Sequence, residues 1–494
     1  MSTSLPRSAP SAQNTDARGI IAFLDALDAS AAGGSGQPGR SGQSGTELHS
    51  LMLLRHGHVI AEGWWAPYTP DGVQHVYSLS KSFTSTAAGF ATAEGLLDLD
   101  APVVSYFPEL DAEVTDPRSR SILVRHIASM AAGHSSEQWD RALATDHDEP
   151  VRGFLLEPPD GEPGATFAYS QSTTYTLAAI IQRVTGQTLL EYLRPRLFEP
   201  LGVERAFWTQ HPVGRDLGFA GLHVTTEAVA RLGQLHLQGG AWGGRQLLAP
   251  EWVAEATRTQ VQNGTDPASD WAQGYGFQFW MARHGYRGDG AFGQFCVVLP
   301  EQDVVLALTT ETSDLQSVLD AAWTHLLPAF EGPDSDPAAA DAALARRLTD
   351  LQVPFRAGTA TEAAIDTDTD TDTVTGAEPP TGEFTVAHSV LDRLTRVSFA
   401  PQELTLHEDD GATTTLPLVP GSWPVRGHLT ARAARTGPDI VLAHVQFVQS
   451  PHKLRITCDL RTGTFDATWR NVPLGVRSKS ALSELAQPPD VDVL

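Results

Sequence analysis

The chain has 494 residues, a hydrophobic fraction of 41% and a formal net charge of -25 at pH 7. A chain of this length and composition can bury a large core and is long enough for two or three domains. The excess of acidic residues argues against nucleic acids and anionic membranes as partners, because basic surfaces bind both. Neutral or cationic small molecules are the expected partners.

The sequence also carries signals about compartment and cofactors. Residues 1–19 lack the apolar stretch of a secretory signal peptide, and no apolar run is long enough to span a bilayer. The two cysteines, Cys296 and Cys458, are far apart and form neither a disulfide framework nor a metal-ligand spacing. We therefore expect a cytoplasmic protein without a metal or another cofactor.

In chain order, residues 1–47 contain a short predicted helix, ARGIIAFLDALDAS, followed by a flexible segment rich in Gly and Ser. Residues 51–65 predict two strands around a polar turn, and a mostly helical stretch follows to about residue 240. Three consecutive strands are expected between residues 274 and 311, and QSVLDAAWTHLLPAF closes the unit as a helix. Strands from both ends with helices between them predict an α/β arrangement.

Residues 331–381 are expected to form a helix and an acidic linker. Asp366, Asp368, Asp370 and Asp372 alternate there with threonine, and such a run cannot bury a core. A calcium loop is the alternative reading, but its turn glycine and terminal glutamate are missing. Residues 382–485 show repeated two-residue alternation with turns between, which predicts a small all-β sandwich or barrel.

Ser78 and Lys81 are the first residues that indicate chemistry. The chain has only three lysines, Lys81, Lys453 and Lys479, and the first follows a serine by three positions in YSLSKSFTS. Apolar spacing predicts a helix here, which would bring the two side chains together. A desolvated lysine can lose its proton near neutral pH and activate a serine hydroxyl, whereas arginine stays charged.

Spacing alone does not establish this role. Ser450 and Lys453 have the same separation, but they lie between two predicted strands and are expected to belong to a turn. The context of Ser78 and Lys81 must therefore decide.

That context resembles the serine β-lactamases and penicillin-binding proteins, in particular their class C-like branch. S-x-x-K at the start of a buried helix is the first signature of this superfamily. The second, a Tyr-x-Asn or Ser-x-Asn, corresponds to residues 164–186, where Tyr169 is in place and Gln171 stands where asparagine is usual. The third, Lys-Thr-Gly or His-x-Gly on an edge strand, is similar to residues 287–305, where Gly290 matches the final glycine.

The resemblance covers residues 48–328, and it implies a fold for residues 48–330. That fold is an α/β (α+β) domain, a β-lactamase-like antiparallel sheet flanked by helices plus an all-helical lobe. The all-β domain of residues 382–485 resembles the lipocalin-like domains that follow it in several relatives. The whole chain is thus expected to pair a serine hydrolase domain with a small barrel or sandwich.

The resemblance also implies a role for each matching residue. Ser78 would attack a carbonyl, Lys81 would take its proton and Tyr169 would relay a proton to the leaving group. The backbone N–H groups of Ser78 and Ala291 would hold the oxyanion. Gly290 would let the strand approach the substrate, and the amide of Gln171 would contact it, although the extra methylene of glutamine is expected to shift that amide outward.

Departures from the family pattern narrow the expected substrate. Gly288 occupies the position where relatives that act on β-lactams or peptidoglycan have Lys or His. Strand alternation is expected to turn Arg287 to the other face, and His284 to lie in a hairpin turn. We find no carboxylate dedicated to a deacylating water, so efficient penicillin hydrolysis is not the favoured function.

The expected function is therefore a serine hydrolase, which could be an esterase, an amidase or a peptidase, that acts through an acyl-enzyme on an uncharged or weakly charged ester or amide. Acyl transfer to a nucleophile other than water is one alternative. A binding module that acylates slowly or not at all is the other. Aromatic residues near the motifs either line an apolar cleft or belong to the core, namely Trp139, Trp271, Phe277, Trp280 and Phe292.

Overall fold

The computed structural model describes residues 5–32, 45–355, 381–474 and 482. Most of the Gly/Ser-rich segment and of the predicted acidic linker, including its four alternating aspartates, lies outside these residues. Among the described residues, none of the helices combines the length and apolar character needed to cross a bilayer.

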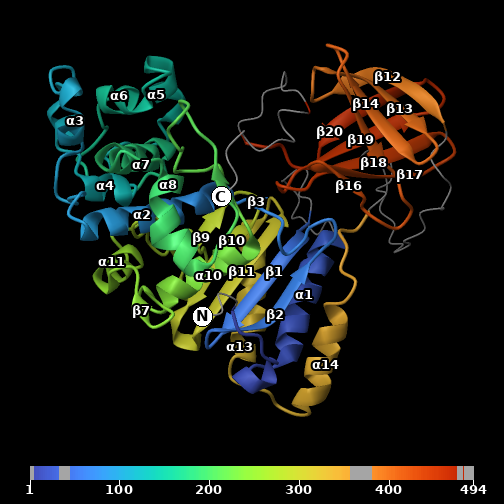
Figure 1. Ribbon diagram of the computed structural model, residues 1–494, viewed down its shortest axis with the longest axis horizontal. Helices are drawn as coiled ribbons and strands as arrows, with labels where there is room; N and C mark the ends of the chain where they lie inside the picture. The colour runs from blue at the N-terminus through green and yellow to red at the C-terminus, as the bar shows by residue number, and fades with distance from the viewer. Residues whose placement is uncertain (1–4, 33–44, 356–380, 475–481, 483–494) are drawn as a thin grey trace.

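A six-stranded sheet forms the centre of the first domain (Figure 1), with the strand order β2-β1-β11-β10-β9-β8 and antiparallel pairing throughout. Leu51 and Leu53 of β1 pack into the core on one face, and Met52 and Leu54 into the core on the other. Both faces are covered, which explains the continuous apolar run in the sequence. The strands are β1 (Glu47–Arg55), β2 (His58–Trp64), β8 (Trp280–Met281), β9 (Tyr286–Gly290), β10 (Gln294–Leu299) and β11 (Val304–Glu311).

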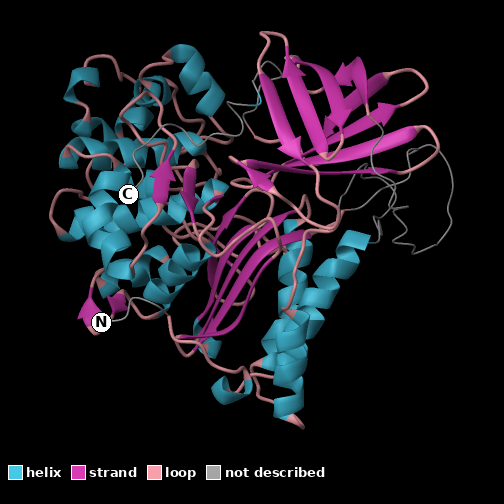
Figure 2. Cartoon of the chain, turned by 45° about the vertical axis from the view of Figure 1, so that its right-hand side comes forward, coloured by secondary structure: helices cyan, strands magenta, loops and turns pink. Residues whose placement is uncertain are grey.

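Helices from the start and the end of the first domain cover one face of this sheet (Figure 2). The expected N-terminal helix is confirmed as α1, and the expected helix at residues 316–330 forms as α12, a π-helical turn and α13. Their bounds are α1 (Ala17–Ala32), α12 (Leu315–Ala321), α13 (Leu327–Ala329) and α14 (Pro337–Arg347).

A helical lobe and α10 lie on the opposite face. Gly233 of α10 allows close packing on the sheet, because a Cβ there would lie 2.6 Å from Val305 Cγ1. The helices on this side are α2 (Ser80–Ala93), α3 (Pro117–Arg120), α4 (Val124–Ala128), α5 (Trp139–Thr145), α6 (Pro150–Leu156), α7 (Gln171–Thr185), α8 (Leu189–Leu193), α9 (Glu199–Leu201), α10 (Thr226–Leu237) and α11 (Pro250–Ala256).

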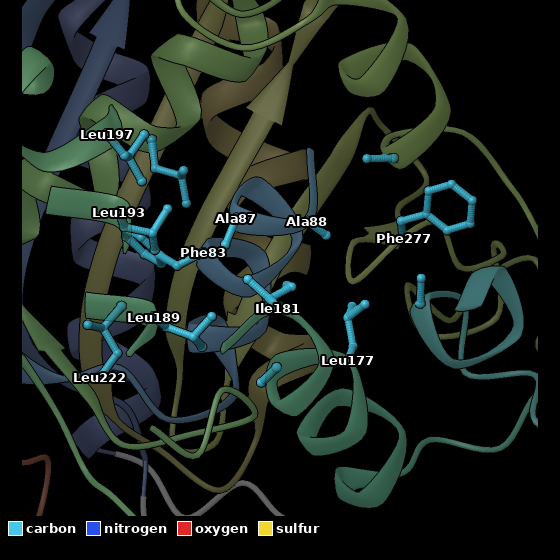
Figure 3. Close-up of a cluster of buried hydrophobic side chains, with 14 of the residues drawn as sticks. Phe83, Ala87, Ala88, Leu177, Ile181, Leu189, Leu193, Leu197, Leu222 and Phe277 are labelled. Carbon is cyan, nitrogen blue, oxygen red and sulfur yellow. The ribbon is translucent and has the colours of Figure 1, made fainter. Parts of the chain in front are cut away.

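Helix α2 runs through the centre of the domain, and all its residues from 80 to 91 are buried. Phe83 and Ala87 pack against apolar residues of α7 and α8, including Ile181 and Leu189 (Figure 3). The helix expected around Lys81 is thus confirmed, and its surroundings fix its position firmly. Short strands complete this side, namely β3 (Gln74–His75), β4 (Ala206–Trp208), β5 (Leu222–Val224), β6 (Ala241–Trp242) and β7 (Arg245–Gln246).

The expectation of three strands between residues 274 and 311 was wrong. Four strands form, because a turn at residues 291–293 divides the second expected strand into β9 and β10. The first of the four, β8, has only two residues. Phe292 and Gly293 take left-handed conformations in this turn, with φ of 65° and 83°. An isolated glycine marked the turn only weakly in the sequence.

The C-terminal domain is a nine-stranded, nearly closed barrel-like sheet with the order β15-β14-β13-β12-β20-β19-β18-β17-β16. The ladder is antiparallel except between β12 and β20, which pair in parallel. Its strands are β12 (Gly382–Ser389), β13 (Leu394–Ala400), β14 (Glu403–Glu408), β15 (Thr413–Pro417), β16 (Val425–Arg426), β17 (Leu429–Arg435), β18 (Ile440–Phe447), β19 (Lys453–Asp459) and β20 (Thr464–Trp469).

Four charged side chains join the two domains, and we call them the interdomain cluster: Glu47, Glu311 and Lys453, which are buried, and Arg470, whose side chain is 20% exposed. Glu47 and Glu311 are directly opposite each other on β1 and β11. Lys453 Nζ donates to Glu47 over 2.5 Å, and Arg470 donates to Glu47 over 2.7 Å and to Glu311 over 3.1 Å. The C-terminal domain thus supplies the cations for two carboxylates of the first sheet.

Candidate active site

Ser78 lies in a 3₁₀ turn, Tyr77–Leu79, immediately before α2. Tyr77 has a φ of 48°, a left-handed conformation that is uncommon for a bulky residue. The hydroxyl of Ser80 donates to the carbonyl of Tyr77 over 2.5 Å and accepts from the N–H of Leu222 over 3.2 Å. This turn presents a half-buried Ser78 at the end of a rigid helix.

The amine of Lys81 lies 3.1 Å from Ser78 Oγ, as the three-residue spacing predicts. Its other partners are Gln171 Oε1 at 2.6 Å and the carbonyl of Phe219 at 2.9 Å. The side chain is 1% exposed, and burial lowers the pKa of Lys81 to about 7, against the opposing effect of the Glu137 and Asp289 charges. A neutral Lys81 can donate to the two carbonyl oxygens while its lone pair accepts the Ser78 proton.

Tyr169 covers this pair. Its ring centroid lies 4.8 Å from Lys81 Nζ, its side chain hydrogen-bonds that of Ser78, and it stacks on Trp280 at 5.2 Å. Burial, followed by the charge of Asp289, raises the pKa of Tyr169 far above its usual value. The phenol therefore stays protonated near neutral pH, which suits a proton donor or relay and not a standing base.

Gly290 brings β9 directly against the Ser78 turn. A Cβ at this position would lie 2.2 Å from the carbonyl oxygen of Val76 and 3.2 Å from the backbone nitrogen of Ser78. Only glycine permits this approach, and Ala291 follows it at the end of the strand. The structure thus brings together the two segments that were predicted to supply oxyanion donors.

Position 288 has no space for the cation of other family members, since a Cβ on Gly288 would lie 2.4 Å from Ser82 Oγ. The neighbouring Asp289 interacts electrostatically with Lys81 and Tyr169. Asp289 thus influences the site by its charge, although the face of β9 that meets the Ser78 turn is that of Gly288 and Gly290.

Arg287 was expected to turn to the face opposite residue 288, and this is confirmed: Arg287 pairs with Val297, which packs in the core on the α1 side, whereas a Cβ on Gly288 would point at Ser82 of α2. The charge of Arg287 also acts on Tyr169, and it stacks on Trp271 at 4.4 Å and lies 5.8 Å from Trp280. Arg287 is fully buried and forms a 2.9 Å ion pair with Asp289, so its charge is already compensated. His284 lies exposed between β8 and β9, as expected of a turn residue.

Gln171 begins α7, and its side chain reaches the centre of the site. The extra methylene was expected to shift its amide outward, but Gln171 Oε1 accepts from Lys81 over 2.6 Å. The backbone N–H of Gln171 donates to Glu137 Oε2 over 2.6 Å, which fixes the start of the helix.

Sequence reasoning missed two contributors to the site. Glu137 is exposed, but it accepts hydrogen bonds from Ser170 and Gln171, and its charge gives the largest electrostatic increase in the pKa of Lys81. Phe219 contributes only its main-chain carbonyl. Glu137 belongs to no recognised sequence motif. Phe219 could not be identified from the sequence, because every residue type has the main-chain carbonyl through which it acts.

The aromatic residues near the motifs divide into two groups. Trp271 and Trp280 surround Arg287 and Tyr169, and Trp139 packs on Phe219. Phe277 belongs to the core, as Figure 3 shows, and is 1% exposed. Among the residues described, no group of three or more potential metal-ligating side chains comes together.

Comparisons with known proteins give the family of the chain. The family model Beta-lactamase matches residues 40–330. The chain belongs to the beta-lactamase family. The family resemblance found in the sequence motifs is thereby confirmed, and the antiparallel sheet with its helices and C-terminal barrel confirms the expected fold class.

Relatives of this beta-lactamase-family protein are hydrolases of several kinds. The 6-aminohexanoate-dimer hydrolase of Paenarthrobacter ureafaciens is 27% identical over 54% of this chain and 73% of its own length. The lovastatin esterase of Penicillium rubens is 27% identical over 37% of this chain and 53% of its own length. The solved structure of EstCE1, described as a hydrolase with promiscuous acyltransferase activity, shares the fold with a TM-score of 0.51 at 17% identity, over 64% of this chain and 99% of that one.

Proposed function

We propose that this protein is a serine hydrolase that cleaves an ester or amide through a covalent acyl-enzyme on Ser78. The observation that carries the proposal is the 3.1 Å contact between Ser78 Oγ and the Lys81 amine, whose pKa burial lowers to about 7. At pH 7 about half of such amines are neutral and can accept a proton. The curated relatives named as a hydrolase and as an esterase support the substrate class.

Each residue of the site has a defined step. Ser78 Oγ bonds to the substrate carbonyl carbon as its proton passes to Lys81, while the N–H groups of Ser78 and Ala291 hold the oxyanion. Tyr169 then gives its proton to the leaving group as the C–O or C–N bond breaks, and recovers one from the Lys81 ammonium. Water attacks the acyl-enzyme by the reverse route, which frees the acid and restores Ser78.

The charges around the site favour a substrate without a carboxylate beside the scissile bond. A side chain at position 288 would clash with Ser82 and Leu79, and Arg287 is neutralised by Asp289 and fully buried. A substrate carboxylate would therefore lose its hydration without gaining a free cation, which is costly in a buried site.

Two measurements test the proposal. Intact-protein mass spectrometry after incubation with a panel of activated esters, amides and β-lactams should show an acyl adduct on Ser78 with the neutral members. The chain should also release a burst of p-nitrophenol from p-nitrophenyl butyrate, which Ser78→Ala abolishes. Lys81→Arg should slow acylation by about 10²-fold or more, because the guanidinium cannot accept the proton.

Ser85→Ala is the matched control, since Ser85 lies on the same helix and donates to the carbonyl of Phe277 over 2.7 Å. It removes a buried hydroxyl without touching Ser78 or Lys81, and its burst should match that of the unmodified chain. If the unmodified chain shows neither adduct nor burst, the domain is a ligand-binding module and the proposed hydrolase function is wrong.

A further inference from the structure

The connection between β18 and β19 of the C-terminal domain lies against the residues that precede Ser78. The backbone N–H of His75 donates to the carbonyl of Gln449 over 2.8 Å, and the side-chain amide of Gln74 donates to the carbonyl of Val448 over 2.7 Å. Both donors belong to β3, beside which the C-terminal domain lies in Figure 1. The domain thus reaches the segment that leads into the candidate nucleophile.

His452, at the end of this connection, contacts both halves of the candidate site. Its Nε2 hydrogen-bonds the hydroxyl of Tyr77, the residue before Ser78. Its ring packs edge-on against Phe292 at a centroid distance of 4.7 Å, and Phe292 follows Ala291 directly. Tyr77 and Phe292 also pack on each other at 5.2 Å. The three rings connect the turn that carries Ser78 to the end of β9. We call β9 the oxyanion strand, because the residue that follows it, Ala291, is a proposed oxyanion donor.

The hydrogen bonds of His452 fix its tautomer. Its Nδ1 lies 3.2 Å from the main-chain carbonyl of Asn471 and must donate there, so Nε2 accepts the hydroxyl proton of Tyr77. The side chain is 4% exposed, and burial lowers the pKa of His452 to about 3, which keeps it neutral at physiological pH. The Asn471 side chain in turn donates to Glu311 over 3.3 Å, which links this contact to the interdomain cluster.

Tyr77 needs such a partner because of its backbone. A left-handed tyrosine persists only where its surroundings determine its conformation, and this conformation directs Ser78 toward Lys81. The turn has two further constraints on the hydrolase side, the Ser80 hydroxyl at its carbonyl and the stacking of His75 on the Tyr77 ring at 4.0 Å. The hydroxyl at the far end of the ring is held by the C-terminal domain.

We propose that His452 is a positioning residue for acylation: through Tyr77 and Phe292, the C-terminal domain holds the Ser78 turn against the oxyanion strand. This role rests on the proposed serine hydrolase function. It makes the C-terminal domain a working part of the active site, although no atom of His452 needs to touch the substrate.

The test measures the acylation rate constant and KM separately, from the p-nitrophenol burst of the full chain. His452→Phe keeps the ring but removes the hydrogen bond, and Tyr77→Phe removes this bond from the other side together with the hydrogen bond from the backbone of Leu474. Each should lower the acylation rate constant roughly 10- to 100-fold, because small misplacements of reacting groups are costly. KM should change by less than about twofold, and the double variant should be no slower than either single variant.

Two further variants separate positioning from general stability. His452→Gln can still accept the Tyr77 proton and should recover much of the rate. His444→Phe alters a different buried histidine, which lies on β18 and packs against Phe355, and should leave the rate constant unchanged. If His452→Phe does not fold, as judged by its thermal transition, Tyr77→Phe decides the question from the hydrolase side.

Failure of the positioning role can be distinguished from failure of the proposed hydrolase function. If the unmodified chain lacks a Ser78-dependent burst, the hydrolase function fails and the positioning role fails with it. If that burst is present and both phenylalanine variants acylate at the unmodified rate, only the positioning role is overturned. A rate loss in His452→Phe that His444→Phe reproduces, or that His452→Gln does not relieve, also overturns it.

Discussion

At the scale of single residues, the amine of Lys81 is surrounded by three oxygens that differ in their hydrogen-bonding capacity. Gln171 Oε1 and the carbonyl of Phe219 can only accept, whereas Ser78 Oγ can also donate. When Lys81 is neutral, its lone pair is therefore left for the serine. The buried helix keeps the charged form costly, which brings the pKa to about 7.

This arrangement predicts the pH dependence of acylation. Because only neutral Lys81 accepts the proton, the acylation rate should rise with pH, reach half its maximum near pH 7 and level off above it. The charge of Glu137 raises the pKa of Lys81, so Glu137→Gln should move the midpoint to lower pH. Stopped-flow bursts between pH 5 and 9 measure this directly.

Glu109→Gln provides the control, since Glu109 is an exposed carboxylate of the same lobe that pairs with Arg183. Its midpoint should coincide with that of the unmodified chain. A midpoint that stays in place or moves upward in Glu137→Gln would contradict the electrostatic coupling of Glu137 to Lys81.

The proposed role of Tyr169 predicts that the effect of its removal on the acylation rate depends on the leaving group. Its phenol is protonated at neutral pH, so it can supply the proton that an amine or alkoxide leaving group requires. Tyr169→Phe keeps the stacking on Trp280 and should reduce acylation by an anilide or alkyl ester about 10²-fold or more. Acylation by a p-nitrophenyl ester, whose leaving group departs as an anion, should fall much less. Equal losses for both substrate types would argue against proton relay by Tyr169.

At the scale of elements, the geometry of the site depends on how β9 meets the turn before α2. Gly290→Ala would place a Cβ 2.2 Å from the carbonyl oxygen of Val76, so the strand must move away from Ser78. An oxyanion donor displaced in this way should cost about 10²- to 10³-fold in the acylation rate. Burst kinetics measure the loss, and the thermal transition reports whether the domain stays folded.

Gly288→Ala is the matched variant on the same strand. Its Cβ would meet side-chain atoms of Ser82 and Leu79, not the backbone around Ser78. It should lower stability but slow acylation less than Gly290→Ala does. An equal loss of acylation in both variants would mean that general strain in β9, and not the approach to Ser78, determines the rate.

The same elements show what sequence patterns can predict. The strands around Arg55, α1, α2 and the helix after β11 follow from local periodicity, and so does the contact between Ser78 and Lys81. The division of β9 from β10 was missed because AFG contains a single turn residue. The contact of Gln171 with Lys81 depends on where α7 begins, and the contact of Glu137 with Gln171 depends on a loop distant in the sequence. No local sequence pattern encodes either contact.

At the scale of the whole molecule, the interdomain cluster links the two domains through ion pairs that are largely buried. Burial alone would raise the pKa of Glu47, but Lys453 and Arg470 hold it well below its usual value. Removing one partner of a buried ion pair leaves an uncompensated charge, so Lys453→Met should lower the free energy of unfolding by about 3–5 kcal/mol. Urea or thermal unfolding measures this loss.

Arg461→Met is the corresponding surface variant in the same domain. Arg461 pairs with Asp459 at 3.5 Å and its side chain is 76% exposed, so its removal should change stability by less than about 0.5 kcal/mol. Similar stabilities for Lys453→Met and the unmodified chain would show that the cluster contributes nothing to the attachment of the domains.

The opposition of Glu47 and Glu311 across β1 and β11 has a consequence for biosynthesis. A nascent chain emerges from the ribosome with its N-terminal part first, and domains tend to fold in that order. When β11 becomes available to pair with β1, Lys453 and Arg470 have not yet been translated. This end of the newly formed sheet therefore carries two opposed carboxylates that repel each other. The repulsion ends when the last strands bring Lys453 and Arg470 to these carboxylates.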